Sequence, residues 1–79
     1  MAPNEILEAL RMRPFKPFRM CLTEGNYYEI RHPEACMPTK RVVFIGLASD
    51  PQDPLPDHTV RVDPLHIIRL EPVAATPKK

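Results

Sequence analysis

Few residues in this chain have the types and spacing that catalysis or metal binding requires. His32 and Cys36 lie four positions apart, a spacing that some pairs of metal ligands use, and His58 and His66 are available to complete a set. A structural zinc site normally shows two closely spaced ligand pairs, whereas one loose pair is present here. Because His32 precedes Pro33 at the end of an expected strand, a turn residue is the simpler interpretation, and we predict no metal site.

The remaining thiol and carboxylates also lack the neighbours that an active site needs. Cys21 falls within an expected strand, where we predict a packed or partly exposed thiol and not a nucleophile with an adjacent base. Asp50, Asp53 and Asp57 lack the glycine and the bidentate glutamate of a calcium-binding loop. The sequence contains neither a phosphate-binding glycine-rich loop nor a nucleophile elbow. We therefore expect no enzyme, no cofactor and no small-molecule substrate.

Basic and aromatic residues gather between residues 13 and 28. Arg13, Lys16 and Arg19 lie close in sequence to several rings. These rings belong to Phe15, Phe18, Tyr27 and Tyr28. Cations that contact phosphates and rings that stack on bases are typical of proteins that bind single-stranded nucleic acid. The alternative is structural packing, in which the phenylalanines beside Pro14 and Pro17 close one end of the fold under a helix.

The composition indicates one small domain. Seventy-nine residues suffice for a single domain at residues 1–72, followed by a flexible tail at 73–79. The net charge is +1, but residues 11–19 are basic and residues 50–63 are mainly acidic. These segments are either two solvated faces or complementary patches that meet between subunits. Two cysteines, no signal-peptide pattern and no long apolar run lead us to expect a cytoplasmic protein with reduced thiols and no membrane partner.

The apolar spacing predicts one helix followed by short strands. Ile6, Leu7 and Leu10 recur at helical spacing, which predicts a helix over residues 4–12 with Asn4 as its N-cap. Alternation and β-branched runs predict strands at residues 18–23, 27–31, 35–37, 41–47, 58–62 and 65–70. The strand at 41–47 is the most hydrophobic, so we expect it to be covered on both faces, by the helix or by a neighbouring subunit.

Eleven prolines against two glycines separate these segments, because proline ends strands and rigidifies turns. One helix followed by about five short strands favours a mostly β fold in which the strands form a small, strongly bent five-stranded barrel. An open sheet of this size would leave long apolar edges. Closure of the barrel, or strand pairing between subunits, removes them.

Four motifs together carry a resemblance to known proteins: Arg13-Pro14-Phe15-Lys16-Pro17-Phe18-Arg19, Glu24-Gly25, His32-Pro33-Glu34 and His66-Ile67-Ile68-Arg69-Leu70-Glu71-Pro72. They resemble a family of short uncharacterised bacterial proteins of the planctomycete type. The resemblance covers residues 4–72, which is nearly the whole chain. It implies no function.

The order of elements is also similar to the Sm-like proteins, which include the bacterial RNA chaperone Hfq. Residues 7–11 leading into 18–25 look like the helix and first strand of that fold, and residues 67–72 resemble its last strand. The resemblance implies an Sm-like or SH3-like barrel, rings built by pairing edge strands, and RNA bound around a pore. Asp63-Pro64-Leu65-His66 stands where the bacterial family has an aromatic-Lys-His-Ala turn, and this departure argues against RNA binding by that face.

Two functional predictions follow from these patterns. The first is a homo-oligomeric assembly or interaction module, which pairs through strand edges in residues 35–45 and 58–70 and brings the basic segment 11–19 near the acidic segment 50–63. The alternative is a single-stranded RNA-binding protein that uses Arg13, Lys16 and Arg19 as its cationic patch.

Overall fold

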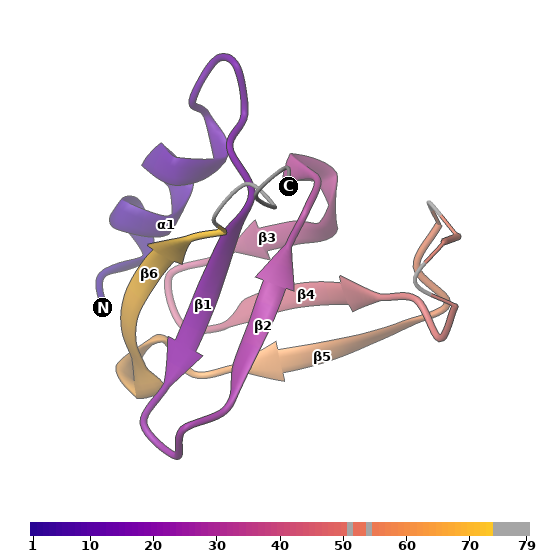
Figure 1. Cartoon of the computed structure of the whole chain (residues 1–79). Coiled ribbons are helices and arrows are strands. Elements are labelled where there is room, and N and C mark those ends of the chain that lie inside the picture. The colour runs from indigo at the N-terminus through magenta and orange to yellow at the C-terminus, as the bar shows by residue number, and fades with distance from the viewer. Residues whose placement is uncertain (51, 54, 74–79) are drawn as a thin grey trace, which may run out of the picture.

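The described part of the chain forms one α-helix, two short 3₁₀ turns and six strands (Figure 1). In this computed structural model the described residues are 1–50, 52–53 and 55–73. The predicted tail at 73–79 lies outside these residues apart from Val73. The backbone N–H of Val73 donates to the carbonyl of Pro17 at 3.1 Å, so the chain is held against the first strand up to this point.

Helix α1 spans Pro3–Leu10. Proline suits the first helical position because the N–H it lacks would have no partner there. The predicted cap is wrong: Ala2 is the N-cap, and Asn4 lies inside the first turn. The predicted C-terminal end is also too late. The helix stops at Leu10 and Arg11 is its C-cap.

Three antiparallel strands form the first sheet, in the order β2-β1-β6. Strand β1 spans Phe18–Leu22, β2 spans Tyr27–Ile30 and β6 spans Ile67–Pro72. The β1–β2 turn places Gly25 at φ 90°, a left-handed conformation that glycine adopts without steric cost. The register pairs Met20 with Tyr28 on one side and with Leu70 on the other, so alternate residues of β1 face the core.

The second sheet has the order β3-β4-β5 and is also antiparallel. Strand β3 spans Cys36–Pro38, β4 spans Val43–Leu47 and β5 spans His58–Val62. The prediction that residues 41–47 contain a central strand is confirmed, because β4 pairs with a neighbour on each side. Helix α1 packs against β3 at one end of this sheet (Figure 1).

Two 3₁₀ turns carry the chain from one sheet to the other. Turn η1, Pro33–Ala35, joins β2 to β3, and turn η2, Pro64–His66, joins β5 to β6. Each begins with proline, whose fixed φ and missing N–H end the preceding strand. The Asp63 side chain accepts the backbone N–H of Leu65 at 2.9 Å and so caps η2. The predicted last strand at 65–70 therefore starts two residues later than expected.

The predicted five-stranded barrel is wrong. The described residues form two separate three-stranded sheets, and neither closes on itself. Closure needs strands that bend continuously from one sheet into the next, whereas the proline-led turns η1 and η2 interrupt the chain at both crossings. A hollow of about 240 Å³, whose lining includes Tyr28 and Arg61, lies between the β1–β2 hairpin and β5.

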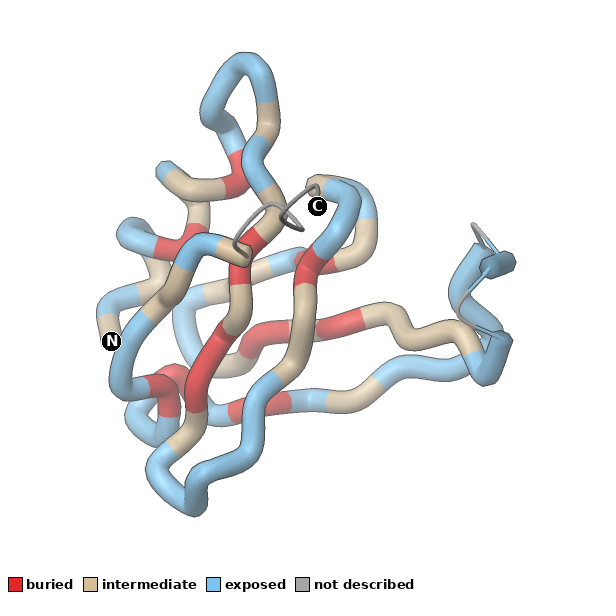
Figure 2. The backbone as a smooth tube through the Cα atoms, in the orientation of Figure 1, coloured by how far each residue is buried: buried red, intermediate tan, exposed pale blue. Residues whose placement is uncertain are grey.

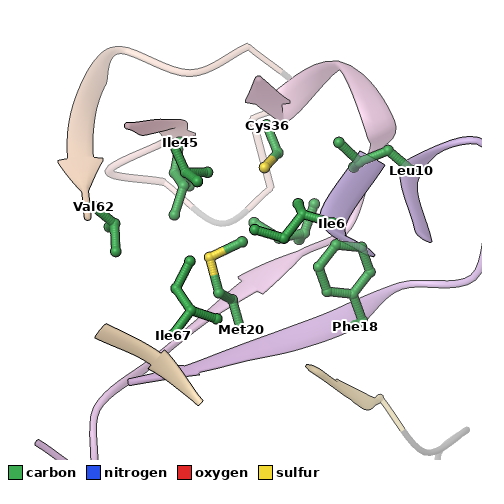
Figure 3. Close-up of a cluster of buried hydrophobic side chains, with 10 residues drawn as sticks. Ile6, Leu10, Phe18, Met20, Cys36, Ile45, Val62 and Ile67 are labelled. Carbon is green, nitrogen blue, oxygen red and sulfur yellow. The ribbon is translucent and has the colours of Figure 1, made fainter. Parts of the chain in front are cut away.

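One hydrophobic core lies between the two sheets and α1 (Figure 2). Figure 3 shows side chains from the helix and from both sheets converging on it. Its buried members are Ile6, Leu10, Phe18, Met20, Ile30, Cys36, Val43, Ile45, Val62 and Ile67. Burying each large aliphatic side chain contributes about 1.5–3 kcal/mol before chain entropy is subtracted. This core is what fixes the outer faces of the two sheets relative to one another.

Candidate functional site

The three predicted nucleic-acid residues, Arg13, Lys16 and Arg19, do not form one patch of free cations. The Arg13 guanidinium donates to the carbonyl of Met12 at 3.0 Å and weakly to that of Leu10, the last residue of α1, at 3.4 Å, so it satisfies backbone carbonyls just before it in the chain. Lys16 is exposed on the α1–β1 connection and makes no ion pair within the described residues. Arg19 lies on β1 and has partners of a different kind.

Arg19 points to the outer face of the first sheet, away from the core. Its Nε lies 3.3 Å from the Glu29 carboxylate, and its guanidinium lies 5.0 Å from the centre of the Tyr27 ring. The other carboxylate oxygen of Glu29 accepts from Arg31 at 2.8 Å. One glutamate therefore holds two guanidinium groups, while Tyr27 gives Arg19 a cation–π contact.

Strand β6 extends this arrangement on the other side of Arg19. The register places Arg19 opposite Glu29 on β2 and opposite Glu71 on β6. Arg69 donates to Glu71 at 2.5 Å, and this hydrogen bond is the main reason that the pKa of Glu71 is lowered, with a smaller contribution from the charge of Arg19. We call these five residues the charged row: Arg31, Glu29, Arg19, Glu71 and Arg69. Three arginines against two glutamates leave one positive charge.

A shallow hollow of about 230 Å³ lies beside the charged row, above β1, and we call it the β1 trough. Tyr27 from β2 lines one side, and Ile68 and Arg69 from β6 line the other. Cys21 lies opposite both Tyr27 and Arg69 in the register, which puts it at the floor between them. The trough is therefore framed by an aromatic ring, an aliphatic side chain and a guanidinium.

The two cysteines differ in the face of the sheet that they occupy: Cys21 is on the outer face of the first sheet, and Cys36 is on the core-facing side of the second. Both thiols are free and buried, but only Cys36 belongs to the core cluster, whereas Cys21 faces the β1 trough. Burial raises the pKa of Cys36 to about 11, so this thiol stays protonated at neutral pH. A protonated core thiol is a poor nucleophile and a poor metal ligand.

The histidines of the metal hypothesis are not brought together with Cys36. His32 is exposed at the N-terminal end of η1, while Cys36 points into the core. Across residues 1–50, 52–53 and 55–73 there is no group of three or more His, Cys, Asp or Glu side chains that could hold a metal ion.

His58 has a different partner from the one that the metal hypothesis gave it. Its Nδ1 lies 2.5 Å from the carboxylate of the neighbouring Asp57. That hydrogen bond, followed by those from Ser49, lowers the pKa of Asp57 to about 2. The Ser49 backbone N–H and hydroxyl donate to this carboxylate at 3.0 and 3.3 Å, which braces the base of the β4–β5 loop.

The outer face of the second sheet carries an apolar surface. The register aligns Met37, Phe44 and Arg61 across β3, β4 and β5, and we call these three residues the β4 outer row. Met37 is 58% exposed, and Phe44 is half-buried without belonging to the core cluster or packing against it. The strand expected to be covered on both faces is thus covered by the core on one face only.

The β4–β5 loop folds back onto β4 beside this row. A Cβ built on Gly46 would lie 2.9 Å from the Cβ of Pro56, so the glycine allows the loop to approach the strand. Two adjoining hollows of about 250 and 180 Å³ lie between this loop and η1 and share His32, Ala35 and Pro56. Figure 1 shows the loop well away from the α1–β1 connection, so the acidic residues of this loop do not meet the basic residues of that connection within one chain.

The comparisons with known proteins add no identity to this geometry. No family model, curated protein or solved structure matches the chain. The likenesses to the planctomycete-type family and to the Sm-like proteins therefore stay predictions. A helix long and apolar enough to span a membrane does not occur in the described residues.

Sequence reasoning found Arg19 but missed the residues around it. Glu29, Arg69 and Glu71 all occupy outward positions of alternating strands, so the period-two pattern contained the signal that they share a face with Arg19. The pattern does not show that β1 pairs with β6, and this pairing brings together residues about fifty positions apart.

Proposed function

We propose that this chain is a non-enzymatic interaction module that assembles with copies of itself. The observation that supports this most is the β4 outer row, where Met37 on β3 and Phe44 on β4, the most hydrophobic strand, present apolar surface outside the core. Exposed apolar patches on a small protein mark interaction sites more often than isolated exposed side chains do. We place the protein in the cytoplasm, with reduced thiols and no bound cofactor.

The small size of the chain favours the same function. A domain of about this length buries only about 60–65% of the surface of its unfolded chain, so burial between copies adds a large share of stability. Assembly is one of the usual ways in which small domains gain a sufficient core. Covering the β4 outer row would bury both faces of β4.

The strand edges contribute unequally to this proposed interface. Strand β3 has three residues and ends at Pro38, and β6 ends at Pro72, and proline lacks the N–H that pairing with a new strand requires. Strand β5 spans His58–Val62 without proline, and its Arg61 belongs to the β4 outer row. We therefore centre the interface on this row and the free edge of β5, inside the ranges 35–45 and 58–70.

Charge complementarity between copies is a second observation in favour of self-assembly. Within one chain, the α1–β1 connection in the basic segment 11–19 lies apart from the β4–β5 loop in the acidic segment 50–63 (Figure 1). Exposed opposite charges speed up encounter and orient partners, although each exposed pair contributes little affinity. Contacts between these segments therefore belong to neighbouring copies, and salt should slow assembly more than it weakens the assembled state.

Replacing one side chain of the β4 outer row tests the proposed assembly. We expect Phe44→Ser to shift the mass measured by light scattering toward that of the 9.1 kDa monomer, because it removes the ring at the centre of the row. Ile68→Ser is the matched control, because Ile68 is a 50% exposed aliphatic residue on the other sheet. If both variants assemble as the unmodified chain does, the interface lies elsewhere.

Single-stranded RNA binding through Arg13, Lys16 and Arg19 is the second candidate function. The observation that favours it is the stacking of Arg19 on Tyr27, which places a cation and an aromatic ring together on an exposed sheet face. Proteins that bind single strands combine these two groups, since guanidinium contacts phosphate and the ring stacks on bases.

The RNA candidate predicts a steep salt dependence. With three cations contacting phosphates, the logarithm of the binding constant should fall with the logarithm of salt concentration with a slope of about −2. Replacing Arg13, Lys16 and Arg19 by glutamine should abolish binding in a fluorescence titration. Absence of binding by the unmodified chain at low salt would remove this candidate and leave the assembly proposal untouched.

A further inference from the structure

The β1 trough has the walls of a binding site for one flat ring. Tyr27 is 52% exposed on one side of it, and Ile68 is 50% exposed on the other. Both are large apolar side chains that the fold leaves outside the core. The floor between them includes Cys21, whose small side chain leaves the space between the Tyr27 and Ile68 side chains unfilled.

A β-bulge is what aims Ile68 at this place. The β1–β6 register pairs Cys21 with Arg69 and then Leu22 with Ile67, so Ile68 is the extra residue opposite the step between them. A bulge leaves its extra residue unpaired in the ladder and redirects its side chain, and bulges are common beside functional sites. Ile68 is thereby exposed from a strand whose neighbouring position, Ile67, is in the core.

Polar groups lie at both ends of the trough. Arg19, Arg69 and Glu71 line one end, and the turn residues Thr23 and Asn26 line the other. Such an arrangement offers hydrogen-bond donors and acceptors to the edges of a ring held between the walls. Glu71 also holds Arg69 at 2.5 Å, so the guanidinium is positioned before any ligand arrives.

The size and charge of the trough define the ligand class. Its volume of about 230 Å³ is below the roughly 300–1,000 Å³ of most small-molecule pockets, so it accommodates one ring system and not a whole dinucleotide. The charged row has a net charge of one, so it attracts a polyanion only weakly. Affinity must therefore come from stacking, with Arg69 and Arg19 contacting the adjacent phosphates.

From these observations we infer that the β1 trough binds one unpaired nucleobase of a single-stranded nucleic acid, between Tyr27 and Ile68. This inference rests on the second candidate function and moves its centre from the α1–β1 connection to the outer face of the first sheet. Arg19 is shared by both arrangements, whereas Arg13 and Lys16 are not needed for the trough.

A titration with a short fluorescein-labelled oligoadenylate tests the inference. We expect Tyr27→Ala to weaken binding about 5- to 150-fold, which is the range for the loss of one stacked base. Tyr27→Leu retains apolar area without an aromatic face, so it should weaken binding nearly as much. Leu55→Ala is the matched control, because Leu55 is 72% exposed on the β4–β5 loop and should leave affinity unchanged.

The salt dependence separates the trough from the basic segment. Two phosphate contacts, through Arg19 and Arg69, give an expected slope of about −1.4 on logarithmic axes. Binding of the Arg13→Gln and Lys16→Gln double variant equal to that of the unmodified chain supports the trough, whereas a loss of binding assigns the contact to the basic segment. The matching oligodeoxyadenylate shows whether the natural strand is RNA or DNA, since only a contact to the 2′-hydroxyl distinguishes them.

The titrations distinguish binding by the basic segment 11–19 from binding in the β1 trough. If no oligonucleotide binds at low salt, both the RNA candidate and the trough are rejected. If the oligonucleotide binds and Tyr27→Ala matches the unmodified chain, the trough is rejected and the basic segment remains. A second readout is amide NMR during titration with adenosine monophosphate: shifts at Cys21, Tyr27 and Ile68 support the trough, and their absence contradicts it.

Discussion

At the scale of single residues, the surroundings of a side chain decide its chemistry here more than its type does. Arg13, Lys16 and Arg19 are all basic and close in sequence, yet Arg13 donates to backbone carbonyls just before it, Lys16 is exposed, and Arg19 contacts both a carboxylate and a ring. The difference arises because Arg19 lies on a strand with neighbours on both sides. A charge pattern along the chain therefore says little about which cations a ligand can use.

Asp57 provides a titration that tests the geometry of the β4–β5 loop. Its pKa should be about 2 in the folded protein, against an ordinary value of 3.8, because His58 and Ser49 donate hydrogen bonds to the charged form. A lowered folded pKa contributes stability above pH 4 that is lost as the pH falls from about 4 through 2. NMR titration of the carboxyl carbon measures this pKa directly.

His58→Leu is the control variant for this titration. It removes the largest cause of the shift, so the pKa of Asp57 should rise toward 3.8 while the hydrogen bonds from Ser49 keep it somewhat lower. A folded-state pKa near 3.8 in the unmodified chain would contradict the described contacts at the base of the loop.

At the scale of elements, Gly46 controls how the β4–β5 loop packs on its strand. We expect Gly46→Ala to destabilise the protein by about 1–3 kcal/mol, the usual cost of forcing extra atoms into a packed contact. The new Cβ would lie 2.9 Å from Pro56, so the loop must move away from β4. Chemical denaturation measures the loss, and NMR shifts of residues 47–57 report the movement.

Gly25→Ala separates this effect from a general intolerance of glycine replacement. A Cβ at Gly25 meets nothing within 4 Å, so its cost comes from the φ of 90° alone, at about 1–2 kcal/mol. It should leave the shifts of residues 47–57 unchanged. If Gly46→Ala also leaves them unchanged, the loop does not rest on β4 as described.

Local structure was predictable from the sequence because local rules decide it. Alternation placed the first strand at Phe18, and Gly25 marked the turn that follows it. The helix was predicted to begin after an Asn4 cap, but Pro3 occupies the first helical position, so the helix begins closer to the N-terminus. The preference of proline for the first helical position outweighed the preference of asparagine for the N-cap.

Long-range pairing was not predictable in the same way. A closed barrel would require β2, at the edge of the first sheet, to hydrogen-bond to β5, at the edge of the second. The hydrophobic periodicity of a sequence does not show whether two such edge strands pair. Pro33 and Pro64 were recognised as breaks, but their role in separating two sheets depends on where the chain goes next. The same limit hid the charged row, which is assembled by the pairing of β1 with β6.

At the scale of the whole molecule, stability rests on one core shared by two open sheets and a helix. We expect Ile45→Ala to cost about 2–5 kcal/mol, because Ile45 is fully buried at the centre of β4 and truncation leaves a cavity. That is a large part of the 5–15 kcal/mol of a typical domain. Ile68→Ala should change stability by about 0.5 kcal/mol or less, since Ile68 is half exposed.

Urea denaturation of both variants makes the comparison. Similar losses at the two positions would mean that Ile68 is covered in solution, as it would be if copies assembled through the first sheet. The result therefore also checks which of the two outer faces is free.

Each proposed function belongs to the outer face of a different sheet. Met37 and Phe44 of the β4 outer row are apolar and suit a second copy of the chain, while the β1 trough combines two apolar walls with the polar ends of the charged row and suits a nucleobase. Because the core lies between the two sheets, one face can be covered in an assembly while the other stays accessible. Assembly would then present several troughs on one particle, and weak single contacts would add through avidity.

The central claim is self-assembly, and the mass of the freshly purified chain in solution tests it most directly. Light scattering coupled to size-exclusion chromatography, with absorbance recorded at the nucleic-acid and protein maxima, should give a whole-number multiple of 9.1 kDa at high micromolar concentration, and nucleic-acid absorbance should account for none of the excess. The multiple should fall on dilution. A mass of 9.1 kDa throughout the micromolar range would contradict the claim.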